Sequence, residues 1–372
     1  MKKNISLAIS LLILVSFGFS GCNSGTKTIK KIGAAQTKVT EKVVKAGFLY
    51  VGPVGDGGYT FAHDQGRLYA EKKLNVKTVI IENVKEDPVE VQKACDNLID
   101  QGVNVIFGTS FGFMDGMVKA AKKHPDIVFM HCSGYETAKN LGVYFGRMEQ
   151  PRYLSGIAAG MKTKANKIGY VAAFEIPECV RQINAFTLGV QSIDKNIKVI
   201  VKWTHTWYDP AKEKEAAKAL LDQGVDVIAQ HQDTAGPMQA AEEKGKFAIG
   251  FNTDARTSAP KAYLTAPIWN WGPYYTKTIK SVIDGTWKTG NYWGGMQDGI
   301  VRLAPLTANV KIGTATKIAI AQKRILAIPN GEFAGPIYDQ TGKLRVAKGM
   351  TLTDAEQLSM DWFVKGVQGK VK

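Results

Sequence analysis

The chain has 372 residues, of which 45% are apolar, 22% charged and 9% aromatic. This composition excludes a disordered, collagen-like or coiled-coil protein, and the length suits two lobes because single cores usually stop growing at about 250–300 residues. The formal net charge is +15, but no recognition-helix, RRM or zinc-finger pattern supports a nucleic-acid partner.

The first 21 residues predict a secretory signal peptide. Residues 1–4 are basic, residues 5–19 form a mostly apolar run, and two small residues precede Cys22. The run is too short for a comfortable transmembrane helix. Cys22 stands where the lipobox of bacterial lipoproteins carries its acylated cysteine, although Phe19 replaces the usual leucine. We therefore predict a lipid anchor on Cys22, with ordinary secretion and a free Cys22 as the alternative.

Residues 22–44 are polar and rich in Lys, Thr, Ser and Gly, which predicts a lipid-anchored flexible linker. Removal of residues 1–21 takes away two lysines and no acidic residue, and so leaves 46 basic against 33 acidic groups, a net charge near +13. We expect this charge to favour attraction to an anionic membrane or wall surface.

From residue 45 onwards the chain contains an internal repeat at a constant offset of 122 residues. Residues 98–106 match residues 220–228 at seven of nine positions, and three shorter matches share the same register. Chance would hardly give four matches in one register, so the repeat predicts two related lobes. We place an N-terminal lobe at residues 45–160 and a C-terminal lobe at 161–300, with residues 301–372 completing the lobes and the hinge.

Each copy of the repeat predicts alternating strands and helices. Apolar runs at 43–51 and 168–174 are typical of buried parallel strands, and a helix follows each run. Ala62, Gly66 and Ala70 form a small-residue stripe that predicts close packing of the first helix on the sheet. The alternation indicates right-handed crossovers and an α/β fold with a doubly wound parallel sheet in each lobe. Further strands are expected at 103–107, 127–131, 142–145, 225–229, 247–252 and 262–268, a turn between short strands at 338–343, and a last helix at 353–364.

The second predicted helix has a clear start. Asp87 is the expected N-cap, Pro88 takes the first helical position, and Glu90 would close a pair that resembles a capping box. Cys95 falls on the apolar face of this helix, which favours a core position. Together with Cys132 and Cys179 it shows no Cys-x-x-Cys spacing, so neither a metal site nor a disulfide framework is predicted.

The predicted ligand site is the cleft between the lobes, because doubly wound sheets bind ligands beyond the carboxyl ends of their strands. The aromatic side chains of its rim suit a flat heteroaromatic ring better than a phosphate or an amino acid, although each taken alone could be a core residue. The predicted rim segments are 52–61, 109–111, 131–133, 147–149, 174–179, 230–233, 252–254 and 269–271, and their aromatic candidates are Tyr59, Phe61, Phe111, Phe174, Trp269 and Trp271.

Two acidic residues of the rim are candidates for polar contacts. Residues 52–58 match neither Gly-x-Gly-x-x-Gly nor the Walker lysine pattern, and Asp56 would repel phosphate. This loop is therefore either a flexible strand–helix link or a contact for an uncharged polar ligand. Asp254 follows an apolar strand, where its carboxylate can accept from ring N–H groups, exocyclic amino groups or hydroxyls, although a helix N-cap would look the same.

No pattern indicates an enzyme. No two of His63, His131 and His231 stand at metal-ligand spacing on one helix, and no serine or cysteine lies in a nucleophile-elbow pattern. We therefore predict no catalytic residue, no metal and no cofactor.

A combination of segments carries a family resemblance. They are residues 52–59 (GPVGDGGY) with 63–67 (HDQGR), 145–154 (FGRMEQPRYL), 252–254 (NTD), and 342–346 (GKLRV) with 362–366 (WFVKG). With the lipobox, these segments resemble the basic membrane protein (BMP) family, which comprises substrate-binding lipoproteins of ABC transporters, many of them purine-nucleoside receptors. The resemblance runs from about Lys45 to the C-terminus and implies the type I periplasmic-binding-protein fold, in which a hinge joins two Rossmann-like lobes that close on the ligand. By position, it implies pocket segments at Asp56, Tyr59, Phe61, Ser110, Phe111, Phe174 and Asp254.

The sequence therefore predicts an extracytoplasmic solute-binding lipoprotein of an ABC importer, anchored to the cell membrane and acting as a monomer. It would capture a purine-type small molecule by lobe closure and deliver it to permease and ATPase subunits on other chains. A sensory lipoprotein without transport, or a binder of a sugar or an autoinducer-like polyol, is the alternative.

A free adenine-like base is the expected ligand, with a purine nucleoside next. Nucleoside-binding relatives typically carry a lysine for the ribose after the Asn-Thr-Asp strand, and residues 264–271 contain none. Each tryptophan there offers only one N–H donor, so buried ribose hydroxyls would be left unpaired. The base is expected to stack among four rings with a carboxylate at its polar edge, unless Trp269 and Trp271 pack inside the C-terminal lobe. The expected contacts are Tyr59, Phe111, Phe174 and Trp269, with Asp254 at the edge.

Overall fold

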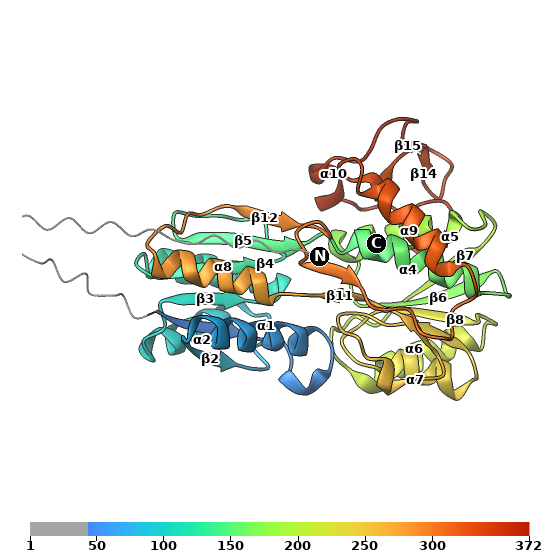
Figure 1. The fold of residues 1–372 in the computed structure, drawn as a ribbon. Helices are drawn as coiled ribbons and strands as arrows, with labels where there is room; N and C mark the ends of the chain where they lie inside the picture. Colours follow the sequence, from blue (N-terminus) through green and yellow to red (C-terminus); the bar gives the residue numbers. More distant parts are fainter. Residues whose placement is uncertain (1–43, 372) are drawn as a thin grey trace, which may run out of the picture. The chain divides into compact units, whose positions relative to one another are not determined.

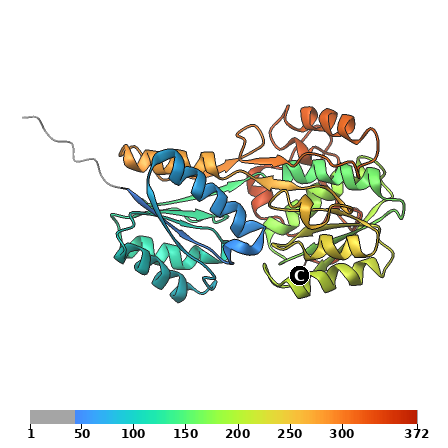
Figure 2. The same cartoon turned by 60° about the horizontal axis from the view of Figure 1, so that its bottom comes forward.

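The computed structural model describes residues 44–371 (Figures 1 and 2). The predicted signal peptide, Cys22 and residues 22–43 of the predicted linker lie outside the described residues. The described part of the chain consists of two α/β lobes, and each lobe has a six-stranded sheet. Within residues 44–371, no helix is long and apolar enough to cross a lipid bilayer.

The N-terminal lobe contains a parallel sheet with the strand order β12-β5-β4-β3-β1-β2. Helices α1 and α8 pack on one face of this sheet, and helices α2 and α3 on the other. The strands are β1 (Lys45–Leu49), β2 (Lys77–Ile81), β3 (Val105–Gly108), β4 (Val128–Cys132), β5 (Leu141–Gly146) and β12 (Asn291–Gly294); the helices are α1 (Tyr59–Leu74), α2 (Pro88–Asp100), α3 (Met114–Lys123) and α8 (Gly272–Ile283).

The C-terminal lobe contains a parallel sheet with the order β10-β9-β8-β6-β7-β16. Helices α4, α5 and α9 pack on one face, and α6 and α7 on the other. The prediction of two doubly wound parallel-sheet lobes is confirmed. The strands are β6 (Lys167–Ala172), β7 (Lys198–Trp203), β8 (Val227–His231), β9 (Phe247–Ile249), β10 (Tyr263–Thr265) and β16 (Val367–Gln368); the helices are α4 (Glu149–Lys162), α5 (Pro177–Gln191), α6 (Pro210–Leu221), α7 (Gly236–Glu243) and α9 (Thr314–Ile325).

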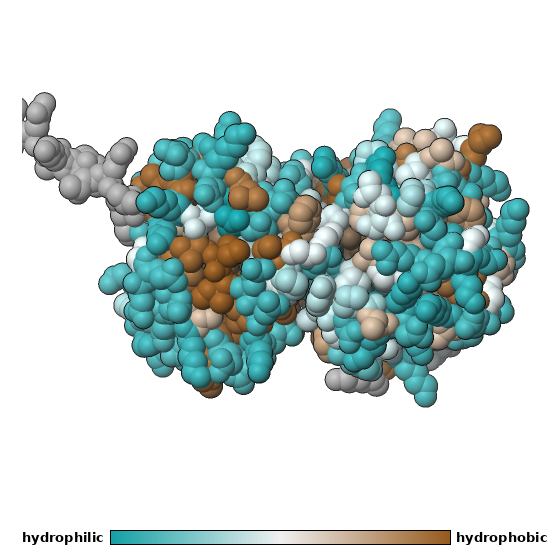
Figure 3. Space-filling view, turned by 90° about the horizontal axis from the view of Figure 1, so that it is seen from below, coloured by the Kyte–Doolittle hydropathy of each residue, from teal (hydrophilic) through white to brown (hydrophobic). Residues whose placement is uncertain are grey.

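The five strands that come first along the chain in each lobe have the same order in both sheets. The sheets differ in the sixth strand, which is β12 beside β5 in one lobe and β16 beside β7 in the other. In the C-terminal lobe, β16 pairs with the outer edge of β7. The strand equivalent to β7 in the N-terminal lobe is β2, and it is the edge strand of its sheet. All five residues of β2 are at least partly exposed. Figure 3 shows hydrophobic residues gathered on the surface of the N-terminal lobe.

Within residues 44–371, the chain passes between the lobes three times. After β5 it enters α4, which packs on α5; after β11 (Pro267–Trp269) it returns to α8, which packs on α1; after β12 it passes to β13 (Val301–Leu303). Strands β11 and β13 pair antiparallel at the crossing. This arrangement differs from the predicted boundaries at residues 160 and 300. Helices α4 and α8 are equivalent in the repeat, and the two are exchanged between the lobes. Helix α4 follows the N-terminal sheet but packs in the C-terminal lobe, and α8 follows the C-terminal sheet but packs in the N-terminal lobe.

The predicted start of α2 agrees with the structure in most respects. The Asp87 side chain accepts from the backbone N–H groups of Val89 and Glu90, with Pro88 at the first helical position. The Glu90 side chain forms an ion pair with Lys93 instead of closing a capping box, because Lys93 lies one turn away on the same helix face. Cys95 is fully buried, as predicted.

The small-residue stripe of α1 serves helix–helix contact as well as contact with the sheet. A Cβ at Gly66 would lie 2.6 Å from Cβ of Trp271, immediately before α8. Ala62 and Ala70 join the core between α1 and the sheet. The close approach required of Gly66 is therefore to α8.

The C-terminal segment forms a short hairpin, β14 (Ile337–Tyr338) with β15 (Leu344–Val346), around the predicted turn. Helix α10 (Asp354–Leu358) begins with a capping box between Thr353 and Glu356 but ends earlier than the predicted residue 364. Beyond this end, the Asn184 side chain of α5 donates to the Trp362 carbonyl and accepts from the Val364 N–H, so these two backbone groups bond outside the helix.

Candidate functional site

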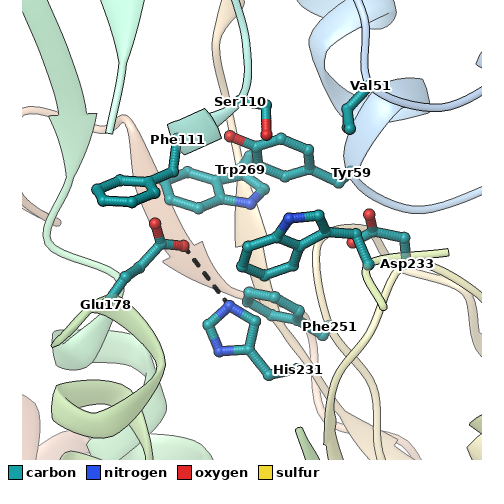
Figure 4. Close-up of a pocket in the computed structure, with 10 residues that line it drawn as sticks. Val51, Tyr59, Ser110, Phe111, Glu178, His231, Asp233, Phe251 and Trp269 are labelled. Carbon is teal, nitrogen blue, oxygen red and sulfur yellow. Dashed lines mark ion pairs between the residues drawn. The ribbon is translucent and has the colours of Figure 1, made fainter. Parts of the chain in front are cut away.

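A cavity lies between the lobes (Figure 4). Most of its wall follows the carboxyl ends of β1 and β3 in one lobe and of β6 and β8 in the other. In each sheet the strand order reverses between these two strands, which is where doubly wound sheets bind ligands. The lining residues are Val51, Tyr59, Ser110, Phe111, Glu178, Trp207, His231, Asp233, Phe251 and Trp269.

Aromatic rings make up half of the lining residues, and two of them are held by hydrogen bonds. The Tyr59 hydroxyl donates to the Thr109 carbonyl over 2.8 Å, and Trp269 Nε1 donates to Asn252 Oδ1 over 2.9 Å. Trp269 also stacks on Trp271 with ring centroids 4.5 Å apart. Because the polar atoms of Tyr59 and Trp269 already have partners, these rings offer a ligand mainly their apolar faces.

Glu178 brings a carboxylate to the cavity from the first turn of α5, where the helix dipole favours negative charge. Its Oε1 lies 3.6 Å from His231 Nε2, the contact drawn in Figure 4, and its Oε2 accepts from the Ser133 hydroxyl. Burial acts to raise the pKa of Glu178, but His231, Arg181 and Ser133 outweigh it and hold this pKa below its usual value. Burial also lowers the pKa of His231 to about 4, so the imidazole is uncharged at neutral pH.

Asp233 is a second buried carboxyl, across the cavity from Glu178 in Figure 4. Burial, followed by the charges of Asp56 and Glu213, raises the pKa of Asp233 well above its usual value. Asn252 Nδ2 donates to Asp233 Oδ1 over 3.1 Å. The raised pKa favours a neutral carboxyl that can donate a hydrogen bond, whereas a charged Glu178 can only accept. The cavity thus offers a flat ligand a donor and an acceptor at separate points.

Arg152 of α4 places a positive charge beside the cavity wall. The residue is fully buried, and its guanidinium donates to Gln182 Oε1 over 3.0 Å and to the Gln230 carbonyl over 2.8 Å. The guanidinium carbon lies 3.7 Å from the centre of the Phe251 ring, which lines the cavity. Arg152 therefore supports this ring and interacts electrostatically with Glu178.

The structure brings four of the predicted site residues together at the cavity, namely Tyr59, Ser110, Phe111 and Trp269. The Ser110 hydroxyl donates to Glu86, so its position is fixed from outside the cavity. Ser110 and Phe111 follow the carboxyl end of β3, as the pattern of parallel strands predicted. Tyr59 is instead the first residue of α1, and Trp269 ends β11, which pairs antiparallel with β13.

The two predicted acidic contacts are not among the cavity residues. Asp56 accepts from three backbone N–H groups of residues 58–61 at 2.7–2.9 Å and so caps the start of α1. Asp254 lines a separate groove together with Phe61, and its carboxylate forms an ion pair with Arg256 at 2.6 Å. Both carboxylates are bound to groups of the protein itself.

Two predicted aromatic contacts lie one layer away from the cavity. Phe174 packs edge-on against Trp207, with ring centroids 5.0 Å apart. Trp271 is 1% exposed and packs between Trp269 and His63 in the N-terminal core, not inside the C-terminal lobe. Each supports a ring that lines the cavity.

Six cavity residues were not among the predicted site residues. Val51 was predicted only as the last residue of a buried strand. Glu178, His231 and Asp233 lie within predicted rim segments, and their position just after β6 and β8 was the available signal. Trp207 and Phe251 lie outside those segments. Within residues 44–371, no group of three or more His, Cys, Asp or Glu side chains is placed to hold a metal ion.

Comparison with known proteins gives a consistent assignment. The family model described as ABC transporter substrate-binding protein PnrA-like matches residues 43–329. A purine-binding protein of Brucella abortus (strain 2308) is 40% identical over 333 residues, which cover 89% of this chain and 95% of that protein. A Haloferax volcanii protein, provisionally named an ABC transporter glucose-binding protein, is 37% identical over 331 residues, covering 89% of this chain and 82% of its own.

Solved structures agree at the level of the fold. An ABC transporter solute-binding protein from Aeropyrum pernix K1 superposes with a TM-score of 0.64 at 21% identity, over 78% of this chain and 88% of that one. Proteins of the matched family bind a small molecule for permease and ATPase subunits and are not enzymes. The chain therefore belongs to the PnrA-like, or basic membrane protein, family of ABC transporter substrate-binding proteins.

Proposed function

We propose that this substrate-binding protein captures a purine between its lobes and prefers a free adenine-like base to the nucleoside. The observation that carries the proposal is the cavity itself, where five aromatic rings surround two buried carboxyl groups of opposite hydrogen-bonding character. A purine has two apolar faces for stacking and an edge with both donors and acceptors.

The proposal must separate a purine from a sugar, because relatives at 40% and 37% identity are named for different ligands. A sugar carries several hydroxyls, and each needs a partner when buried. The Tyr59 hydroxyl and the Trp269 N–H are already bonded to the protein. Besides the Trp207 N–H, the remaining polar side chains of the cavity are Ser110, Glu178, His231 and Asp233. The Ser110 hydroxyl is already bonded to Glu86. The small number of free hydrogen-bonding side chains favours a planar heteroaromatic ligand over a sugar.

The small number of polar side chains in the cavity also favours a free base over a nucleoside. No lysine or arginine lines the cavity. A ribose would bring additional hydroxyls, and each one buried without a partner would cost about 1–3 kcal/mol. Glu178 and Asp233 replace Asp254 as the proposed polar contacts, since Asp254 is paired with Arg256.

The location proposed for the protein is the extracytoplasmic face of the cell membrane, with a lipid anchor on Cys22. The support is the sequence pattern around Cys22 together with membership of a family of ABC transporter substrate-binding proteins.

Titration calorimetry with adenine, adenosine and D-glucose in parallel tests the ligand. We expect adenine to bind at least ten-fold more tightly than adenosine, and glucose not to bind. Tighter binding of adenosine would contradict the preference for the base. Binding of glucose alone would contradict the purine proposal as a whole.

A further inference from the structure

Ser133 has an unusual backbone conformation for its residue type. It lies in the loop after β4 of the N-terminal lobe with φ of +68°, in the left-handed region. Within residues 44–371, most other non-glycine residues with positive φ are asparagines, which tolerate this region best. A serine is held there only when its surroundings impose it, which points to a functional constraint.

The surroundings of Ser133 fix this loop tightly. The Ser133 N–H donates to the Tyr144 carbonyl over 2.9 Å. A Cβ at the next residue, Gly134, would come within 1.9 Å of His131 Nδ1, so the loop lies directly against this ring. His131 Nε2 in turn donates over 2.8 Å to the carbonyl of Ser110, a cavity residue. The loop is thus coupled to the wall of the ligand site.

The consequence of this conformation is a contact across the cleft. The Ser133 hydroxyl donates to Oε2 of Glu178, which belongs to α5 of the other lobe. The other oxygen, Oε1, lies 3.6 Å from His231 Nε2. Glu178 lines the cavity, so this contact between the lobes ends on a proposed ligand contact.

We propose that Ser133 is a positioning residue that latches the lobes together: when they close, its hydroxyl binds Oε2 of Glu178 and leaves Oε1 facing the ligand. Closure then completes the ligand site, and a bound ligand in turn favours the closed state. The expected effect of Ser133 on ligand affinity rests on the proposed function. The contact between Ser133 and Glu178 that holds the lobes together does not depend on which ligand binds.

A second contact between the lobes provides a matched control. Thr253 Oγ1 donates to the Gly57 carbonyl over 2.6 Å. This bond also links the lobes, but neither residue lines the cavity or touches Glu178. Thr253→Ala therefore removes one hydrogen bond between the lobes without touching a cavity carboxylate.

The test compares Ser133→Gly, Ser133→Asn and Thr253→Ala in stopped-flow dissociation of adenine. Glycine removes the hydroxyl and relieves the positive φ, so we expect dissociation about ten-fold faster without a lower melting temperature. Asparagine tolerates positive φ and brings an amide donor, so it should restore most of the slow dissociation. Thr253→Ala should change the rate by less than about three-fold, as expected for an exposed hydrogen bond. Equal rates for wild type and Ser133→Gly would overturn the proposal.

Small-angle scattering of the ligand-free proteins separates the latch from the choice of ligand. Without the latch, Ser133→Gly should populate open lobes more than the wild type and show a larger radius of gyration. If the wild type binds no purine, the proposed function fails and this comparison alone decides the latch. An identical radius of gyration for the two proteins would then refute it.

Discussion

The two cavity carboxyls are expected to respond differently to the same isosteric change. Glu178→Gln exchanges a charged acceptor for a neutral amide. Asp233→Asn exchanges a carboxyl whose neutral form is favoured for an amide of similar shape that can still donate. If a purine donates to Glu178, both of its oxygens accept, one from the Ser133 hydroxyl and one from the purine, whereas glutamine has only one acceptor oxygen. If the purine also accepts from Asp233, only the Glu178 substitution removes a hydrogen bond.

The expected magnitudes follow from the charge of each group. A hydrogen bond to a charged group contributes about 1.5–3 kcal/mol, so Glu178→Gln should weaken adenine binding about ten- to a hundred-fold. Asp233→Asn should change the affinity by less than about three-fold. Asp233→Ala removes the donor altogether and should cost about 0.5–1.5 kcal/mol, or about two- to ten-fold.

The pH dependence has the same physical origin. The pKa of Asp233 is raised by burial and by neighbouring negative charge, so its proton is present below that pKa and is lost as the pH rises through it. Wild-type affinity should therefore fall on the alkaline side, and Asp233→Asn should remove this loss. The lowered pKa of Glu178 keeps its carboxylate charged down to mildly acidic pH.

Titration calorimetry of adenine at pH 6 and pH 9 measures these effects. Glu215→Gln is a suitable control because its side chain is 70% exposed on α6, outside the cavity. If Asp233→Asn weakens binding as strongly as Glu178→Gln, Asp233 does not act as a neutral donor and the reasoning is refuted.

Three further substitutions test the site and its location. Gly58→Ala would place a Cβ 2.1 Å from the Asp233 carbonyl oxygen of the opposite lobe, so it should abolish tight adenine binding at an unchanged melting temperature, whereas Gly55→Ala, with no atom within 4 Å, should bind normally. Asp254→Ala should change the calorimetric affinity by less than about three-fold, because this carboxylate pairs with Arg256; a ten-fold loss would return Asp254 to the site. Cys22→Ser should release the protein from the membrane fraction after a high-salt wash, and equal retention would contradict the lipid anchor.

Local sequence patterns predicted most of the fold because they repeat. The offset of 122 residues gave equivalent strands in both lobes, and the two sheets show the same order for these strands. The exchange of α4 and α8 between the lobes was not predictable in this way. A repeat identifies equivalent helices, but the lobe on which each packs depends on the path of the chain through the crossing.

The sequence could not decide whether Asp254 or Asp233 lies at the cavity. Both residues follow a strand of the C-terminal lobe, so their positions in the chain predict a ligand contact for each of them equally. Asp233 follows β8, which neighbours β6 where the strand order reverses, whereas Asp254 follows β9, one strand further out. Only the order of strands in the sheet separates a carboxyl at the cavity from one beside it.

Glu332 has a buried carboxyl group whose raised pKa should appear as a pH dependence of stability. It lies in the short helix Gly331–Phe333, is 2% exposed, and neither carboxyl oxygen has a hydrogen-bond partner among the described residues. Burial, followed by the neighbouring charge of Glu149, raises the pKa of Glu332 to about 8. Between the ordinary pKa of about 4.3 and this value, the folded protein holds a proton that the unfolded chain has lost.

The free energy of unfolding should therefore fall as the pH rises through this window, by up to about 5 kcal/mol for this group. Glu332→Gln keeps the shape and removes the charge, so the variant should be more stable than the wild type at pH 9 by a few kcal/mol and show little gain at pH 4.5. Urea unfolding at the two pH values, with the exposed Glu215→Gln as control, measures the difference. A gain of the same size at both pH values would mean that Glu332 is not protonated in the folded protein near neutral pH.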